Sequence, residues 1–426
     1  MERQYKDSGI EWIGKIPVGW DTTKLGSLYS QRNEKVSDKD YAPLSVTMQG
    51  ILPQLETAAK TDDGDNRKLV KKGDFAINSR SDRRGSCGIS PYDGSVSLIN
   101  TILKPRGEMN PNFYNWLFHT SLFADEFYKW GHGIVDDLWT TRWQEMKNIS
   151  VVTPPLPEQQ RIASYLDKKC GEIDELIDLQ EKMIAQLKEY KHAVITEAVT
   201  KGLDPNAKLV PSGIEWIGDV PEGWKVCRIK DIFLLRTGST PKEFEQGLES
   251  ESLVNWFTPS DVSEMNCELF TSERHLSESV VKKECIELNP IGSLVFVGIG
   301  ASAGKIGYAK VEGYSNQQIT SLIPRKGMCH SKFCYYFMIS DRKRIRDNAF
   351  FTTLPIINNS YLSGVKILFP PLPEQHSIAT YLDTKCSEID SLIALKRQKI
   401  ESLKAYKKSV IYEAVTGKVN VLREVA

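Results

Sequence analysis

The chain contains the same long segment twice. Residues 154–200 align without gaps to residues 370–416, and 30 of the 47 positions are identical. A shorter segment, Ser-Gly-Ile-Glu-Trp-Ile-Gly, stands upstream of each copy, at residues 8–14 and again at 212–218. The residues between the matched segments have diverged almost completely. A chain that keeps its framework twice and varies two inserts is suited to presenting two different surfaces.

Each long copy predicts a helix with a coiled-coil seam. In the first copy, Pro157 followed by Glu158 is a favourable helix start, because proline fits the first turn and the acid lies near the positive end of the helix dipole. Apolar residues then recur at alternating three- and four-residue steps, interrupted by polar residues such as Lys191 and Lys407 at matched positions. One helix cannot bury such a stripe alone, so we expect the two helices to pair antiparallel within the chain. The predicted seam comprises Leu166, Cys170, Ile173, Ile177, Ile184, Leu187, Leu382, Cys386, Ile389, Ile393, Ile400 and Leu403.

The two diverged inserts are predicted to share a fold. Short apolar runs broken by turn residues indicate strands in both, and an offset of 219 residues aligns Gly85 with Gly304 and Gly88 with Gly307. Aromatic-rich stretches after the strands, at 113–128 and 332–346, look helical. We therefore expect an α+β protein in which two α/β modules, with mixed or antiparallel sheets, are joined by two long helices forming an antiparallel coiled coil with pseudo-twofold symmetry. The predicted division is 1–153 for the first module with its short segment 8–20, 154–200 for the first helix, 201–369 for the second module with its short segment 212–224, and 370–426 for the second helix and tail.

Composition narrows the class of protein. With 426 residues and 40% hydrophobic content, the chain has enough apolar residues for several cores. No apolar run reaches the length of about 18 residues that a membrane span needs, and the N-terminus has no apolar signal region. Eight cysteines occur without any Cys-x-x-Cys spacing. We expect a reducing, cytoplasmic location and no contact with a membrane.

Net charge does not favour a nucleic-acid binder that works by bulk charge. Fifty-five basic residues balance 55 acidic residues, whereas dedicated nucleic-acid binders are usually basic. Local basic clusters occur, and for each cluster alone a solvated face is the favoured interpretation. The clusters are Lys68, Lys71 and Lys72; Arg80, Arg83 and Arg84; and Arg342, Lys343, Arg344 and Arg346.

One stretch of the second insert partly matches two known motifs, the nucleophile elbow of serine hydrolases and the phosphate-binding loop. Residues 300–304 match the Gly-x-Ser-x-Gly elbow of serine hydrolases around Ser302. The elbow needs a helix next, whereas the following residues read as a strand, so we expect a hairpin turn. The same stretch does not match a phosphate-binding loop, which requires four residues between its glycines and Ser or Thr after its lysine, whereas Ile306 follows Lys305. The sequence also contains no metal-ligand spacing and no dinucleotide fingerprint.

At its doubled segments the chain resembles the specificity subunit of a type I restriction-modification system. The resemblance rests on Ser-Gly-Ile-Glu-Trp-Ile-Gly before each insert and on Pro-Pro-Leu-Pro-Glu-Gln at each helix start, and it covers nearly the whole length. It implies two target recognition domains, each reading one half of a split, asymmetric sequence in double-stranded DNA, with the coiled coil as a ruler between them. It also implies assembly with two modification (methyltransferase) subunits and with restriction subunits. Catalysis, S-adenosylmethionine, ATP and Mg²⁺ would then belong to those partners, and this chain would hold no catalytic residue, cofactor or metal.

The glycine-framed loops of the inserts are where we expect contacts to DNA. Arginine pairs with guanine and glutamine with adenine in the major groove, so exposed Arg and Gln side chains are the natural readers. The candidates are Arg80, Arg83, Arg84, His132 and Arg142 in the first insert, and Ser239, Thr240, Ser302, Lys305, Gln317, Gln318, Thr352 and Thr353 in the second.

Two other functions stay open from the residues alone. A repeat protein whose modules bind protein or sugar would show no salt-dependent affinity for DNA. A serine hydrolase would lose its activity on Ser302→Ala.

Overall fold

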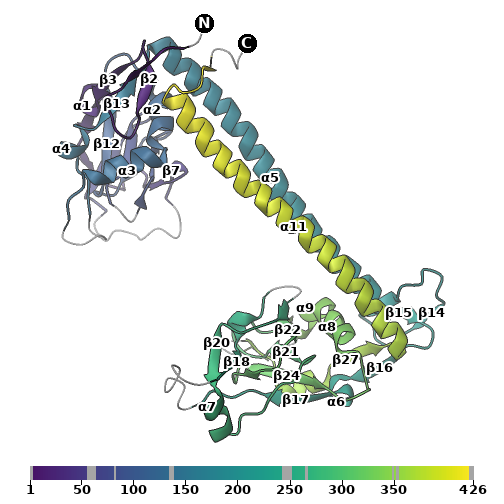
Figure 1. Ribbon diagram of the computed structural model, residues 1–426. Helices are drawn as coiled ribbons and strands as arrows, with labels where there is room; N and C mark the ends of the chain where they lie inside the picture. The colour runs from purple at the N-terminus through teal and green to yellow at the C-terminus, as the bar shows by residue number, and fades with distance from the viewer. Residues whose placement is uncertain are drawn as a thin grey trace. The chain divides into compact units, whose positions relative to one another are not determined.

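The structure of the protein is a computed structural model. The structure describes residues 3–54, 64–80, 83–133, 139–241, 252–263, 267–347, 350–351 and 355–421. The chain forms two compact units, one made of Met1–Gln180 with Arg397–Ala426 and the other of Glu181–Lys396. Each unit holds one α/β module and parts of two long helices (Figure 1). Among the described helices, none combines the length and apolar character needed to cross a membrane.

The long helices α5 (Leu156–Lys201) and α11 (Leu372–Val415) correspond to the repeated segments. In the first unit, Lys407 Nζ of α11 lies 2.7 Å from Asp174 Oδ1 of α5. In the second unit, Lys191 Nζ of α5 lies 2.7 Å from Asp390 Oδ1 of α11. Lys191 and Lys407 are matched repeat positions, as are Asp174 and Asp390. In each unit the early part of one helix therefore contacts the late part of the other, which is antiparallel pairing.

The predicted seam is largely removed from solvent. Apolar residues at three- and four-residue steps occupy one face of a helix, so pairing buries them together. Ile177 and Leu187 are half-buried. The other ten seam residues are buried: Leu166, Cys170, Ile173, Ile184, Leu382, Cys386, Ile389, Ile393, Ile400 and Leu403.

The module of the first unit is built on antiparallel strands. Its main sheet has the order β10 (Cys87–Ile89), β9 (Phe75–Asn78), β12 (Asn100–Pro105), β4 (Tyr29–Arg32). Beside it are a sheet of β11 (Gly94–Val96), β8 (Arg67–Val70) and β5 (Lys35–Val36), and a hairpin of β6 (Leu44–Thr47) and β7 (Gly50–Pro53). The short helices are α1 (Leu25–Leu28), α2 (Pro111–Phe118), α3 (Ser121–Lys129) and α4 (Trp143–Met146). Phe118 of α2 packs against Phe75 and Tyr29 of the main sheet, and Phe123 of α3 packs against Phe118.

The module of the second unit repeats this plan with a mixed sheet. Its main sheet has the order β17 (Phe233–Thr237), β24 (Ile319–Pro324), β21 (Leu294–Val297), β22 (Ile306–Ala309), β19 (Cys267–Leu269), with β19 and β22 parallel. A second sheet contains β20 (Arg274–Ser277), β18 (Leu253–Phe257) and β23 (Tyr314–Ser315), and β25 (Phe350–Phe351) pairs with β26 (Pro355–Ile356). The helices are α6 (Ile229–Ile232), α7 (Glu278–Lys283), α8 (Ser331–Ser340), α9 (Arg342–Asp347) and α10 (Asn359–Gly364), with a 3₁₀ turn at Pro259–Asp261.

The sequence predicts one helix after the strands of each module, whereas the structure has two helices there in each module. In the first module Thr120 interrupts it, because the Thr120 hydroxyl accepts a hydrogen bond from Phe123 N and so caps the start of α3. In the second module Asp341 stands between α8 and α9. The expectation of antiparallel or mixed sheets is confirmed in both modules.

The short repeated segments anchor each module to a helix start. In the first unit they form the hairpin β1 (Tyr5–Asp7) and β2 (Lys15–Pro17), followed by β3 (Asp21–Lys24) paired with β13 (Ser150–Thr153). In the second unit the equivalents are β14 (Leu209–Pro211) with β15 (Asp219–Pro221), and β16 (Lys225–Arg228) with β27 (Lys366–Phe369). Trp20 Nε1 donates to Glu158 at 2.8 Å, and Trp224 Nε1 donates to Glu374 at 3.1 Å. The tryptophan of each repeated Gly-Trp pair, at 19–20 and 223–224, therefore contacts the glutamate of the Pro-Glu pair at the helix start.

Candidate nucleic-acid interface

The loop between β9 and β10 and the loop between β21 and β22 share backbone hydrogen bonds at their described residues. In both, the strand residue before the loop donates to the residue that ends it: Asn78 N to Ser86 O at 2.8 Å, and Val297 N to Lys305 O at 2.9 Å. Gly85 and Gly304 both take positive φ, 74° and 89°, which favours glycine at these positions. A further hydrogen bond is matched at the offset of 219: Ser79 N to Ile99 O with Gly298 N to Gln318 O. The carbonyls of Ser79 and Gly298, also matched at this offset, each accept a hydrogen bond from a later segment, from Thr141 N and from Ile357 N.

The side chains at matched positions of the two loops differ. Arg80, Arg83 and Arg84 are exposed in the first module. The same offset places Ile299, Ser302 and Ala303 at these positions in the second, and Ala303 is buried. A turn that keeps its hydrogen bonds while its side chains change is suited to carrying variable recognition groups.

The structure brings the first-module candidates together around this loop. Arg80 forms an isolated bridge with Thr140, and Thr140 also bridges to His132. Arg142, two residues further, is exposed and precedes α4. Arg84 is engaged by α3, with its Nη1 3.2 Å from Asp125 Oδ1 and its guanidinium 4.9 Å from the centre of the Tyr128 ring.

The second-module candidates also gather at one end of the main sheet. Because β17 and β21 end where β24 and β22 begin, Ser239, Thr240, Gln317 and Gln318 lie at the same sheet end as the Gly304 loop. The Thr240 hydroxyl donates to Gln317 Oε1, and Gln318 Nε2 lies beside Gly300. Ser302 and Lys305 are half-buried within the loop. Thr352 and Thr353 lie outside the described residues.

Ser302 occupies a turn between two strands. The strand β22 begins at Ile306, so the helix that a nucleophile elbow requires is absent from this described stretch. The expectation of a hairpin is confirmed. Within the part of the chain that the structure describes, no group of three or more His, Cys, Asp or Glu residues is placed to hold a metal.

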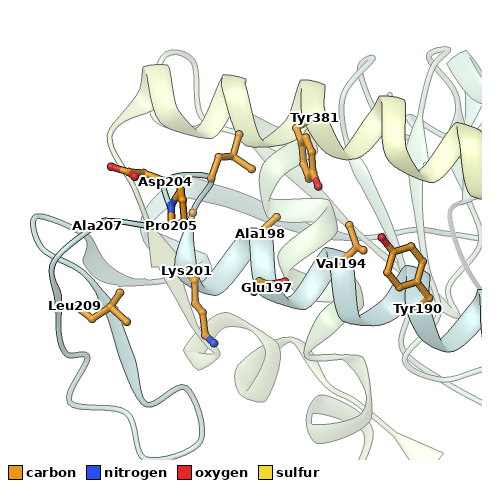
Figure 2. Close-up of a pocket in the computed structure, with 12 residues that line it drawn as sticks. Tyr190, Val194, Glu197, Ala198, Lys201, Asp204, Pro205, Ala207, Leu209 and Tyr381 are labelled. Atoms are coloured by element: carbon orange, nitrogen blue, oxygen red, sulfur yellow. The ribbon is translucent and has the colours of Figure 1, made fainter.

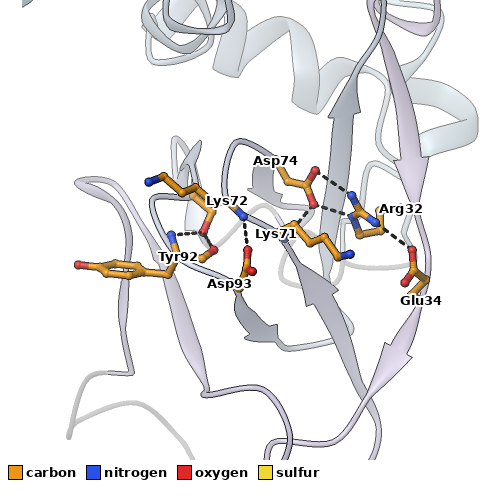
Figure 3. A network of polar contacts seen from close by, with 8 residues as sticks. Arg32, Glu34, Lys71, Lys72, Asp74, Tyr92 and Asp93 are labelled. Atoms are coloured by element: carbon orange, nitrogen blue, oxygen red, sulfur yellow. Dashed lines mark hydrogen bonds and ion pairs between the residues drawn. The ribbon is translucent and has the colours of Figure 1, made fainter.

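One basic cluster lies away from this sheet end. Lys71 and Lys72 precede β9, whereas the arginine loop follows it. Asp74 accepts hydrogen bonds from Lys71 N and from Arg32 Nε, the latter at 2.6 Å (Figure 3). The hydrogen bond between Arg32 and Asp74 raises the pKa of Arg32. Lys72 N donates to Asp93. Lys68 Nζ donates to Asn100 O, and burial lowers the pKa of this lysine. These contacts hold the sheet together.

A pocket of about 710 Å³ lies where α5 ends in the second unit. Figure 2 shows it lined by side chains of the last turns of α5, by the following linker and by Tyr381. None of the candidate DNA-binding residues lines it. It therefore belongs to the repeated framework and not to the variable loops.

Sequence reasoning missed two arginines at the second loop. A Cβ atom built on Gly304 would lie 3.4 Å from Cβ of Arg346 and 3.9 Å from Cγ of Arg342. Both arginines belong to the basic run of α9, for which a solvated face was the favoured interpretation. Their spacing of four residues places them on one helix face, but the same spacing occurs on a solvated face and does not identify the contact.

Comparisons with known proteins agree with this architecture. The family model described as "Type I restriction modification DNA specificity domain" matches residues 17–189 and again 221–405. The chain is 24% identical over 434 residues to the type I restriction enzyme MjaVIII specificity subunit of Methanocaldococcus jannaschii, covering 96% of this chain and 94% of that one. It is 22% identical over 432 residues to the type I restriction enzyme EcoDI specificity subunit of Escherichia coli, covering 92% and 88%.

Solved structures share the fold. A structure titled "Structural basis underlying complex assembly and conformational transition of the type I R-M system" matches with a TM-score of 0.73 at 16% identity, covering 95% of this chain and 99% of the other. The HsdS subunit of Thermoanaerobacter tengcongensis matches with a TM-score of 0.51 at 16% identity, covering 95% and 98%. With both family matches spanning most of the sequence, this chain belongs to the type I restriction-modification DNA specificity family, whose members are non-catalytic recognition subunits.

Proposed function

We propose that this chain recognises a bipartite, asymmetric DNA sequence and directs adenine methylation or restriction by partner subunits. The first module reads one half-site and the second module reads the other. The observation that carries the proposal is the matched loop, which keeps its backbone hydrogen bonds in both modules while its side chains change. Two different sets of side chains on the same loop framework would recognise two different half-sites.

In the first module, we propose that Arg80, Arg83, Arg84, His132 and Arg142 contact DNA. In the second, the proposed contacts come from Ser239, Thr240, Ser302, Lys305, Gln317, Gln318, Thr352 and Thr353. The supporting geometry is that the described members of each set lie around one loop at one sheet end. The functional division follows the sequence repeats, with modules at 1–153 and 201–369 and helices at 154–200 and 370–426.

Two modification subunits are the proposed partners, with restriction subunits in the full complex. The support is a second apolar stripe that both long helices leave exposed at matched positions. The exposed pairs are Leu176 and Leu392, Leu179 and Leu395, and Tyr190 and Tyr406. A surface that occurs twice suits two copies of one partner. S-adenosylmethionine, ATP and Mg²⁺ would act in those partners.

Methylome sequencing tests the proposal. A host expressing this chain with its modification subunit should methylate adenines in one split sequence. Replacing Arg83 and Arg84 by Ala should relax or weaken recognition of one half-site only, because each lost bidentate arginine contact costs about 1–3 kcal/mol of discrimination.

The control for this experiment is the other half-site. Its sequence and methylation level should be unchanged in the double variant. Equal loss at both half-sites would contradict the assignment of one module to each half-site, and absence of any split methylated sequence would contradict the proposed function.

A further inference from the structure

Helix α9 is the most strongly basic short element of the second module. Its six residues carry four cations and one carboxylate. Arg342 and Arg346 are one turn apart and therefore share a face. Cβ and Cγ of Arg346 and Cγ of Arg342 stand within 4 Å of the position that a Cβ on Gly304 would take, so both side chains begin beside Gly304 of the β21–β22 loop.

The first module distributes its charge in the opposite way. There the loop carries the arginines, and the helix beside it, α3, carries Asp125 and Glu126 with one lysine. Arg84 of the loop pairs with Asp125 of that helix. In the second module the equivalent loop, residues 298–305, holds a single cation, Lys305, and the helix supplies the arginines. Cations thus occur beside the same turn in both modules but come from different elements.

The arginines of α9 do not share one role. Arg344 holds the module together, because its Nε donates to Asp341 at 2.7 Å and its guanidinium lies 4.0 Å from the centre of the Trp216 ring. Arg346 is exposed and forms no ion pair with the residues that the structure describes. An exposed arginine without a carboxylate partner, fixed beside a recognition loop, is well placed to bind an anion.

We infer that Arg342 and Arg346 bind phosphates of the DNA backbone beside the half-site that the second module reads. This inference rests on the proposed function. The loop side chains at 299–303 are small or apolar and let the backbone approach the bases, whereas the long arginines reach from the flank. Phosphate contacts of this kind set position and affinity but carry no base preference.

A salt titration of binding tests the inference. The full chain, assembled with its modification subunits, is titrated against a labelled duplex carrying the methylated sequence, from about 0.05 to 0.3 M salt. Arg342→Gln and Arg346→Gln should each weaken binding by about 3- to 10-fold near 0.15 M salt and make the slope of log affinity against log salt shallower by about 1. The preference for the correct second half-site over a scrambled one should stay unchanged.

Lys343→Gln is the matched control. Lys343 is exposed on the same helix and has the same charge, but the three atoms nearest to the Cβ position of Gly304 belong to Arg342 and Arg346. It should leave the salt slope unchanged, and all three variants should unfold at the wild-type temperature.

Three results would overturn the inference. The first is an unchanged salt slope in Arg346→Gln, and the second is an equal loss of affinity in Lys343→Gln. The third is a lost preference for the correct half-site, which would show that the arginines contact bases. A wild-type complex that does not distinguish the site from scrambled DNA would refute the proposed function itself, and this inference with it.

Discussion

The buried side chain of Lys332 connects the second module to α11. The Lys332 side chain is 4% exposed, lies 4.5 Å from the centre of the Tyr308 ring, and pairs with Glu268 of β19 and with Asp383 of α11 at 3.5 Å. Burial alone would raise the pKa of Glu268, but hydrogen bonds from Lys332 and Lys310 outweigh it and leave that pKa lowered. Such a cation is expensive to bury and costly to remove once its partners are in place.

Replacing Lys332 by Met should destabilise the protein by about 1–3 kcal/mol, because two carboxylates lose their buried partner. Chemical denaturation of the full chain measures this. The contribution of Glu268 is present above its unfolded pKa near 4.3 and is lost as pH falls through its lowered folded pKa, so the variant should lose less stability on acidification.

Lys310→Met provides the comparison, because Lys310 meets the same carboxylate from a more exposed position. Lys310→Met should lower the free energy of unfolding by less than Lys332→Met does. Equal losses in the two variants would show that burial of Lys332 does not determine how much stability its ion pairs contribute.

At the residue scale, sequence reasoning was right about the turn and incomplete about its surroundings. Two aligned glycines were enough to predict that the loops of Arg83 and Ser302 correspond, because positive φ restricts the position to glycine. The contact of Arg346 with the second loop was not predictable, since a basic run has the same pattern on a solvated face. Only the packing of α9 against Gly304 distinguishes a contact with the loop from a solvated face.

At the scale of elements, the polar residues in the helix seam have a definite role. Lys191 and Lys407 interrupt the apolar pattern at matched positions, and each pairs with an aspartate of the other helix. A charged pair in a seam fixes register at a cost in stability. The two pairs differ in burial, because the Lys191 side chain is 3% exposed and that of Lys407 is 26% exposed.

This difference predicts unequal costs for two equivalent substitutions. Asp390→Ala should destabilise by about 1–2 kcal/mol, because it leaves Lys191 buried without its partner. Asp174→Ala should cost less than about 1 kcal/mol, as is usual for exposed pairs. Thermal unfolding of the two variants compares them directly, and the exchange Lys191→Asp with Asp390→Lys should recover part of the loss. A larger cost at Asp174 would contradict the burial argument.

Long elements were easier to predict than short ones. Periodicity over more than forty residues predicted α5 and α11, and their ends agree with the structure to within a few residues. The break between α2 and α3 was missed, because apolar and aromatic residues continue across it and only the cap at Thr120 marks it. Two-residue strands such as β5 and β23 carry too few side chains for any pattern.

At the scale of the whole molecule, the order of segments predicts that the chain closes on itself, so that Thr416 and Gly417 lie beside the N-terminal segment. The structure confirms this within the first unit, where Arg3 Nη1 donates to Val419 O at 3.3 Å and Tyr5 Oη donates to Lys418 O at 3.2 Å. Gly417 has φ 72° and packs against Pro17. Gly202, with φ 75°, packs in the same way near Pro221, where the chain is continuous.

This correspondence predicts a functional circular permutant. The first and last residues of this sequence are joined by a linker of about a dozen residues, which spans at most roughly 40 Å, and the chain is opened between Lys201 and Ser212. Because Arg3 and Tyr5 contact Val419 and Lys418, a linker of this length can join the two segments, so the permutant should fold with wild-type stability and methylate the same two half-sites. A control permutant opened at Gln180, inside α5, should lose stability, since it cuts a continuous helix. Loss of folding in the first permutant, or a change in either half-site, would show that the two junctions are not equivalent and that the pseudo-twofold does not extend to the linkers.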